Sequence, residues 1–207
     1  MRVEERLLAR AAEALDGADG DASARRVLDA ARVAIADQGI QALTMEDVAR
    51  SAGVGRATIY RKFENRDALV EAVLLDDLRR YLDRLEGVMD AAGDLVDQLV
   101  EGYVHTLAWV REESLLRAVV EHDGDWGMQY FTLPAGPVLA AARHYLAGRL
   151  RRERPAGAVP DTDQVAELLV RLCHSLMLTP DGVIPHEDGA ASRAFARSVL
   201  VPLVVTD

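Results

Sequence analysis

The sequence predicts an all-α protein, and three observations support this. Half of its 207 residues are apolar, which is enough for one sizeable core or two small ones. Almost every periodic segment has apolar residues three and four positions apart, as amphipathic helices do. Stretches rich in glycine, aspartate or proline separate these segments. We expect an N-terminal extension over residues 1–22, a compact region over 23–68 and a larger helical region over 69–207.

Composition and the N-terminus narrow the possible classes of protein. The single cysteine, Cys173, cannot form an internal disulfide, so we expect a reducing compartment, by default the cytoplasm. Charges of both signs interrupt the N-terminal apolar positions, which excludes the apolar segment of a signal peptide. The longest uncharged run, residues 126–142, contains Pro134 and Pro137 and is shorter than the ~20 apolar residues that span a bilayer. We therefore expect no membrane partner.

The compact region begins with three short helical patterns. Ser23 is expected to cap a helix that ends at Gly39. Thr44, with Asp47 three residues later, predicts the start of a second helix. A third helix is expected over about 55–63, and a long amphipathic helix follows it.

The second and third of these helices predict a helix-turn-helix. Gly53 is the expected turn residue, because glycine adopts positive φ without a Cβ penalty. Two short helices joined by such a turn, with a preceding helix to pack against, form this motif.

Positive charge is concentrated at this motif. The net charge of the chain is −10, and residues 81–207 carry 11 basic and 19 acidic side chains. Residues 50–66, in contrast, carry five basic side chains and one acidic side chain. A local basic patch is what contact with phosphates requires. The alternative interpretation of such a cluster is a solvated helical surface.

The third helix would present a surface suited to duplex DNA. Ile59 and Phe63 would face the supporting helices, which leaves the opposite side outward. Arginine pairs with guanine through two hydrogen bonds, and small side chains contact the thymine methyl group. Hydroxyl groups and the amides that open a helix suit phosphates. The candidate DNA-binding residues are Thr44, Gly55, Arg56, Ala57, Thr58, Tyr60, Arg61, Lys62 and Arg66.

The stretch "ALTMEDVARSAGVGRATIYRKFENRDALVEAV" resembles the N-terminal signature of the TetR family of transcriptional regulators. The shared features are a T-x-x-x-[IV]-A helix, an A-G-V turn, a T-[LI]-Y recognition helix and the entry to a fourth helix. The resemblance covers residues 24 to about 75. Arg66 stands where the family usually has lysine, which keeps the positive charge. Gly55 stands where the family often has serine or threonine, which removes a side-chain cap.

The resemblance implies a homodimeric repressor. Residues 23–68 would then form the DNA-binding domain and bind a palindromic double-stranded DNA operator. Residues 69–207 would bind a small apolar or amphipathic effector that releases the repressor, and would also form the dimer. The alternative is a helical protein of the same fold with a non-regulatory or enzymatic role in its C-terminal domain.

Two segments hold the candidate effector-binding residues. The first is a helix over residues 95–111, in which aromatic and polar side chains lie near Gly102; the second is the aromatic-rich loop "HDGDWGMQYFTLPAGPV". For both segments the alternative interpretation is ordinary core packing. The candidates are Tyr103, His105, Trp109, Trp126, Met128, Tyr130 and Phe131.

The last two helices are the candidate dimer interface. A helix capped by Asp161 or Thr162 has two apolar stripes, so it needs two burial partners, one of which can be a second subunit. The closing helix follows, and Pro202 is expected to kink or fray its end. In the resembled family these two helices form a four-helix bundle with their symmetry mates. The candidates are Val165, Leu168, Leu169, Leu172, Leu176, Phe195 and Val199.

The sequence gives little support for an enzyme. Cys173 and His174 are adjacent, and adjacent helical side chains point about 100° apart, so they do not form a catalytic pair. The five histidines show no spacing typical of metal ligands, and no phosphate-binding loop or nucleophile elbow is present. We expect no catalytic residues, no metal site and no cofactor.

Overall fold

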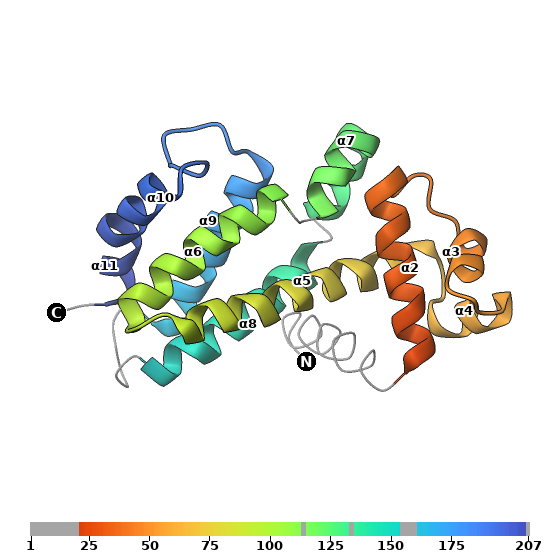
Figure 1. Cartoon of the computed structure of the whole chain (residues 1–207), viewed down its shortest axis with the longest axis horizontal. Coiled ribbons are helices and arrows are strands. Elements are labelled where there is room, and N and C mark those ends of the chain that lie inside the picture. The colour runs from red at the N-terminus through yellow and green to blue at the C-terminus, as the bar shows by residue number, and fades with distance from the viewer. Residues whose placement is uncertain (1–20, 113–114, 133–134, 154–160, 206–207) are drawn as a thin grey trace. The chain divides into compact units, whose positions relative to one another are not determined.

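The computed structural model describes residues 21–112, 115–132, 135–153 and 161–205. Nearly all of the expected N-terminal extension, residues 1–22, lies outside the described residues. Every regular element in the described part is helical, as the sequence predicts. No helix in this part is long and apolar enough to cross a membrane. The helices are α2 (Ala22–Gln38), α3 (Met45–Ser51), α4 (Arg56–Lys62), α5 (Arg66–Ala91), α6 (Leu95–Glu112), α7 (Leu115–Met128), α8 (Gly136–Glu153), α9 (Thr162–Leu178), α10 (Gly189–Phe195) and α11 (Val201–Val204) (Figure 1).

The chain forms two compact units. The first unit contains the described residues up to Arg80 and those from 115 to Val138, and the second contains the remainder. The long helix α5 contributes to both units. The sequence predicts one region for all residues after 68, whereas α7 packs against α2 in the first unit. Burial is the reason, because Leu115 and Val119 of α7 lie in the core of the first unit.

Local sequence signals determine where α2 and α3 begin and end. Asp21, and not the expected Ser23, caps α2, because its carboxylate accepts two backbone N–H groups of the first turn at 2.9 and 3.2 Å. The helix ends at Gly39 as expected, and this residue has φ +80°. Thr44 caps α3 by accepting a hydrogen bond from the backbone N–H of Asp47 at 3.1 Å.

The turn between α3 and α4 forms as the sequence predicts. Gly53 has φ +64°, a conformation that favours glycine. The backbone N–H of Val54 donates to the carbonyl of Ala49 at 3.0 Å and closes the turn. Gly55 precedes α4 and gives it no side-chain cap. Figure 1 shows α3 and α4 following α2 in a helix-turn-helix.

A continuous core holds the first unit together. The helices α2, α4, α5 and α7 contribute Ile35, Ile59, Val70 and Val119, and each of these side chains is fully buried. Burying a side chain of this size contributes about 1.5–3 kcal/mol. Because Ile59 points into this core, the opposite side of α4 must face outward.

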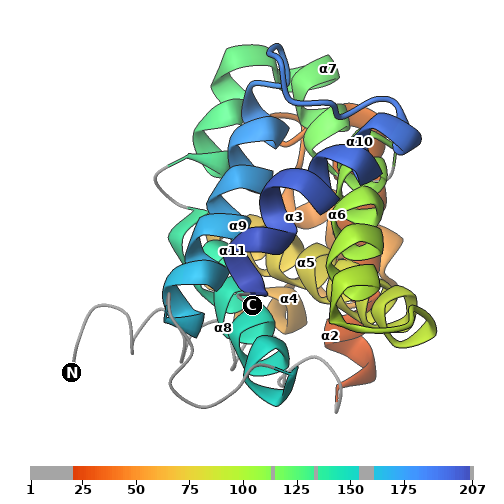
Figure 2. The same ribbon diagram turned by 90° about the vertical axis from the view of Figure 1, so that its left-hand side faces the viewer.

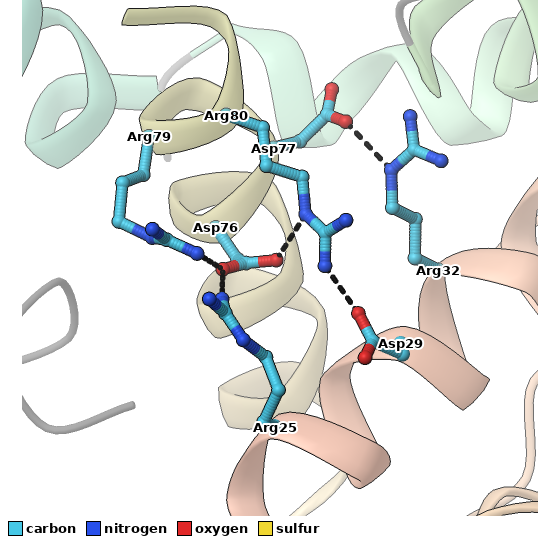
Figure 3. Close-up of polar contacts among 7 residues, drawn as sticks. All are labelled: Arg25, Asp29, Arg32, Asp76, Asp77, Arg79 and Arg80. Carbon is cyan, nitrogen blue, oxygen red and sulfur yellow. Dashed lines mark hydrogen bonds and ion pairs between the residues drawn. The ribbon is translucent and has the colours of Figure 1, made fainter. Parts of the chain in front are cut away.

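A buried carboxylate of α5, Asp76, connects α5 to α2 (Figure 3). It accepts hydrogen bonds from Arg25 of α2 and Arg79 at 3.0 Å each, and from Arg80 at 2.8 Å. Arg80 also pairs with Asp29 of α2. Burial raises the pKa of Asp76, but the hydrogen bonds from Arg80 and Arg79 outweigh burial, so the pKa lies below its usual 3.8. This network joins the two longest helices of the first unit.

The neighbouring carboxylate, Asp77, connects α5 to α2 and α7. It accepts a hydrogen bond from Arg32 of α2 at 2.9 Å and another from the backbone N–H of Leu115, the first residue of α7. Here burial outweighs the effect of Arg32, so the pKa of Asp77 is raised.

The aromatic-rich segment that the sequence predicts as a loop is mostly helical, so that expectation was wrong. Helix α7 continues to Met128, and a 3-10 turn follows over Gln129–Phe131. Within α7 the helical backbone is interrupted by a kink at Gly124, which has φ +53° and ψ −141°.

The second unit is a helical bundle with its own core. Val100 of α6, Leu150 of α8, Val165 of α9 and Leu200 are buried together. Figure 2 shows α9, α10 and α11 facing the viewer in this unit. Asp161 caps α9. Its carboxylate accepts hydrogen bonds from the backbone N–H of Asp163 at 3.0 Å and from that of Gln164 at 3.4 Å.

The closing segment of the chain changes its helical form before Pro202. A π-helical turn over Ala196–Leu200 joins α10 to α11, and Pro202 lies in the first turn of α11. Proline is tolerated in a first turn, where its missing N–H is not needed. Pro202 therefore lies just after the change from π to α form, and the expected kink stays a prediction.

Replacing Asp76 by asparagine should lower the free energy of unfolding at pH 7 by about 1–3 kcal/mol, because the arginines lose a charged acceptor. Asp76 has a lowered pKa in the folded state, so its stabilisation is present above pH 3.8 and is lost as the pH falls through the folded-state value. The difference between variant and wild type should therefore shrink below pH 3.8. Urea unfolding across pH measures both effects.

The control is Asp37→Asn, which removes an exposed carboxylate of α2 and should change stability by less than about 0.5 kcal/mol. Equal losses for Asp37→Asn and Asp76→Asn at pH 7 would show that the network contributes nothing specific.

Candidate functional site

The outer surface of α4 is the candidate DNA-binding surface. Arg56, Ala57 and Arg61 are exposed there, and Thr58 is half-buried. Tyr60 is 40% exposed, which is high for a tyrosine in a folded domain. The expected outward orientation therefore holds for these five residues.

Arg56 lies in the first turn of α4, and its partners among the described residues are exposed. Its Nη2 lies 3.1 Å from Oε1 of Glu46 on α3, and its guanidinium lies 5.6 Å from the centre of the Tyr60 ring. Both side chains of the ion pair are exposed, and such pairs contribute at most about 1 kcal/mol. A stronger acceptor could therefore replace Glu46 at little cost.

The side chain of Lys62 is expected to point outward, but the structure holds most of it away from solvent. Its side chain is only 14% exposed, and its ammonium pairs with the carboxylate of Asp21, the cap of α2. The hydrogen bond from Lys62 is the largest cause of a lowered pKa at Asp21. A phosphate contact by Lys62 would have to compete with this pair.

Two further candidates lie at helix starts. Arg66 is half-buried, and its Nη2 donates to the carbonyl of Ile40 at 2.6 Å, so part of its guanidinium holds the loop between α2 and α3. Thr44 is exposed, and its hydroxyl donates to the carboxylate of Asp47 at 2.6 Å.

The start of α5, next to Arg66, is capped by Asn65. Its side-chain oxygen accepts a hydrogen bond from the backbone N–H of Ala68 at 2.9 Å.

In the second unit, His105 and Trp109 of α6 gather around Tyr81 of α5. The Tyr81 ring stacks on His105 at a centroid distance of 6.2 Å and tilts against Trp109 at 4.7 Å. Its hydroxyl lies 2.5 Å from the hydroxyl of Thr106. Burial and the positive charge of Arg84 lower the pKa of His105, which favours the neutral imidazole.

Tyr103 lies on a different side of α6 from His105. Its ring lies 5.9 Å from that of Phe195, and the residue is 6% exposed. Burial and the neighbouring Cys173 raise the pKa of Tyr103 to about 12, and burial raises the pKa of Cys173 to about 12. Two polar atoms, Oη of Tyr103 and Nε2 of His105, are buried without a hydrogen-bond partner among the described residues. Such atoms are uncommon in folded proteins and mark places where a partner is missing.

Gly102 allows close packing of α6 and α5. A Cβ atom at this position would lie 3.4 Å from side-chain atoms of Leu85 and Met89. The glycine therefore accommodates neighbouring side chains, which favours the core-packing interpretation at that position.

The second candidate effector segment belongs to the first unit. Phe131 packs against the core of that unit, and Met128 ends α7. The side chains of Trp126 and Tyr130 lie outside the described part of the structure. Met128 and Phe131 therefore belong to the first unit, whereas Tyr103, His105 and Trp109 belong to the second.

The candidate dimer residues divide into buried and exposed groups. Val165 and Leu169 belong to the core of the second unit, with Leu172, Leu176 and Phe195 packed against it. Leu168 is 51% exposed and Val199 is 45% exposed.

Sequence reasoning missed two carboxylates beside α4, namely Asp21 and Glu46. Asp21 could have been found, because aspartate is a preferred helix cap and stands directly before α2. Glu46 gives no such signal, because its pairing with Arg56 depends on how α3 crosses α4.

Two family models match the chain, and the second of them includes α7 together with C-terminal helices. The model for "Bacterial regulatory proteins, tetR family" matches residues 27–73, and the model for "Bacterial Tetracyclin repressor, C-terminal domain" matches residues 94–199. The HTH-type transcriptional regulator AlkX of Mycobacterium tuberculosis is 29% identical over 178 residues, which cover 84% of this chain and 81% of the relative. The HTH-type transcriptional regulator UidR of Escherichia coli is 26% identical over 182 residues, covering 84% and 87%.

A solved structure extends the comparison to the fold. The TetR family repressor AlkX from a Dietzia strain, implicated in biodegradation of n-alkanes, superposes with a TM-score of 0.66 and 26% identity. The match covers 87% of this chain and 96% of that one. These relatives are transcriptional regulators and not enzymes. The chain therefore belongs to the TetR family of transcriptional regulators, and residues 27–73 of its first unit match the family's DNA-binding helix-turn-helix region.

Proposed function

We propose that the protein is a homodimeric repressor that leaves its operator when a small neutral amphipathic effector binds the second unit. The observation that carries this proposal is the exposed basic surface of α4, where Arg56 and Arg61 project from a helix fixed by the buried Ile59. The net charge of −10 is unfavourable for DNA contact elsewhere, so this local surface is where a duplex would bind. Such a regulator would act in the cytoplasm.

Each subunit would place α4 in one major groove. The first turn of a recognition helix reaches base edges, which assigns base contacts to Arg56, Ala57 and Thr58. Phosphate contacts would come from the rim of the surface: Thr44, Gly55, Tyr60, Arg61, Lys62 and Arg66. Two subunits would read half-sites about 34–36 Å apart.

The dimer would form through α9 and the closing helices. Leu168 and Val199 are large apolar side chains that remain about half exposed while their neighbours fill the core of the second unit. A second copy of this surface would bury both side chains, as isologous interfaces do.

The effector would bind beside His105 of the second unit. Nε2 of His105 lacks a partner among the described residues, and a ligand could supply one. The imidazole of His105 is neutral near pH 7, since its pKa is lowered. A neutral polar group on an apolar body fits this imidazole better than a charged one. The Dietzia relative, implicated in n-alkane biodegradation, makes straight-chain compounds reasonable first probes.

Effector binding must favour a different dimer geometry if it is to release DNA. A ligand shifts an equilibrium only by its difference in affinity for the two states. The two units are joined by the continuous helix α5, which begins at Arg66 beside the DNA-binding surface.

Arg56→Ala tests the base-reading role. Selection from a random-sequence library with the wild-type protein should recover a pseudo-palindromic duplex, and binding to this selected duplex is measured by fluorescence anisotropy. The variant should lose about 1–3 kcal/mol of binding free energy and should accept more bases at one position of each half-site.

The matched control is Arg117→Ala, which removes an exposed arginine of α7 and should leave both affinity and base preference unchanged. Retention of full base preference by Arg56→Ala would exclude Arg56 as a base contact. Failure of the wild type to enrich any sequence would contradict the operator itself.

Leu168→Glu tests the dimer. The charge would be buried in the proposed interface, so sedimentation velocity at micromolar concentration should show a monomer with unchanged helical content. Val120→Glu alters a side chain of α7 that is also 51% exposed and should leave the dimer intact. A dimeric Leu168→Glu variant would remove α9 from the interface.

A series of straight-chain probes tests the effector class. An alkane, a 1-alkanol and a carboxylic acid of equal length are compared by thermal shift and by release of the selected duplex. The 1-alkanol should stabilise the wild type most and release the duplex, and Trp109→Ala should lose both responses while still binding DNA. If no probe acts, or if the acid acts most strongly, the proposed effector chemistry is wrong.

A further inference from the structure

The loop between α2 and α3 is held by a buried carboxylate of α7, Asp123. Its Oδ2 accepts the backbone N–H of Ile40 at 2.5 Å, and its Oδ1 accepts the backbone N–H of Gln41 at 2.8 Å. Asp123 is only 6% exposed, so water competes little for these bonds. Hydrogen bonds to a carboxylate are roughly twice as strong as those between neutral groups. Each oxygen of Asp123 therefore fixes one of two consecutive amides.

The backbone on both sides is shaped to admit this carboxylate. Gly39 has φ +80°, and a Cβ atom there would lie 2.6 Å from Oδ2 of Asp123. On α7, a Cβ atom at Gly127 would lie 2.6 Å from Cβ of Asp123 and 2.4 Å from the side chain of Val119. A side chain at either glycine would displace the carboxylate, so the contact requires glycine at both positions.

The same loop is held from its other side by α5. Arg66 donates to the carbonyl of Ile40 at 2.6 Å, so both polar groups of the residue, its N–H and its carbonyl, are bonded to side chains of other helices. The Ile40 side chain is fully buried. Thr44, the cap of α3, follows three residues after Gln41. The position of this short loop therefore determines where α3 begins.

Helix α7 is fixed at both of its ends within the first unit. Its first residue, Leu115, donates its backbone N–H to Asp77 of α5, and Asp123 binds the loop near its other end. Leu115 and Val119 lie in the core between these points. A shift of α7 would therefore move the loop as well.

We propose that Asp123 is a positioning residue for DNA binding. Its carboxylate holds residues Gly39–Gln41, and through them the start of α3, in the arrangement that lets Thr44 and α4 meet the duplex together. This proposal rests on the proposed function, namely that the first unit binds DNA. It adds that DNA binding depends on a residue of α7. When the carboxylate is removed, the loop samples other positions, and affinity falls with the fraction of molecules that remain competent.

The primary test compares Asp123→Asn with Asp125→Asn. In Asp123→Asn, the asparagine keeps one acceptor oxygen but turns an amide donor toward the second backbone N–H. Asp125 is the control position, because it is an exposed neighbour of the same charge. With the selected duplex at fixed salt, Asp123→Asn should bind about tenfold or more weakly, as expected for loss of a buried charged hydrogen bond. Asp125→Asn should bind as the wild type does. Wild-type affinity in a fully folded Asp123→Asn variant would overturn the proposal.

Amide exchange separates positioning from general loss of stability. In Asp123→Asn, exchange at Ile40 and Gln41 should accelerate while core amides such as Val70 keep wild-type rates. Uniform acceleration, with unchanged affinity per folded molecule, would show that Asp123 only stabilises the fold and would overturn the proposal.

A double-mutant cycle with Gly39→Ala provides an independent test. The added methyl group should displace the carboxylate, so Gly39→Ala alone should weaken duplex binding to a similar extent. Once one change has broken the contact, the second should add little, which gives strong non-additivity. Simple addition of the two losses would show that Gly39 and Asp123 do not act through one contact, contrary to the proposal.

Discussion

The burial of α2 against the first half of α5 is the constraint on which the DNA-binding surface depends. Ile35 of α2 and Val70 of α5 belong to the core that also receives Ile59 of α4. Once Ile59 is inside, helical geometry places Arg61 on the outside, and Arg56 is exposed at the first position of α4. Buried carboxylates of α5 then bind arginines of α2 across the same interface and oppose sliding of one helix along the other (Figure 3).

Charge pairing explains how an acidic chain keeps a basic surface. Asp76 and Asp77 are turned inward and are satisfied by arginines, so they contribute little negative potential near α4. Asp21 neutralises Lys62 at the end of α4, whereas Arg61 remains exposed. The positively charged surface therefore includes fewer side chains than the five basic residues in 50–66. It is centred on the outer side of α4.

The sequence predicted those features that depend on neighbouring residues. The cap at Thr44, the turn at Gly53 and the inward side of α4 follow from local rules, and the structure has all three. The buried carboxylates could not be predicted, because an aspartate in a helical pattern normally faces water and its partners lie far along the chain. Asp123 is the extreme case: it lies in a segment that the sequence predicts as a loop, and its partners, the amides of Ile40 and Gln41, carry no side-chain signal.

Hydrogen–deuterium exchange of the protein with and without the selected duplex tests the central claim most directly. If the outer side of α4 meets DNA, the duplex should slow amide exchange in α3, in α4 and in the first turn of α5. Exchange in α10 and α11, which belong to the second unit, should change little on DNA addition. Slower exchange confined to the second unit, with α3 and α4 unaffected, would contradict the claim that the helix-turn-helix of the first unit is where this protein binds DNA.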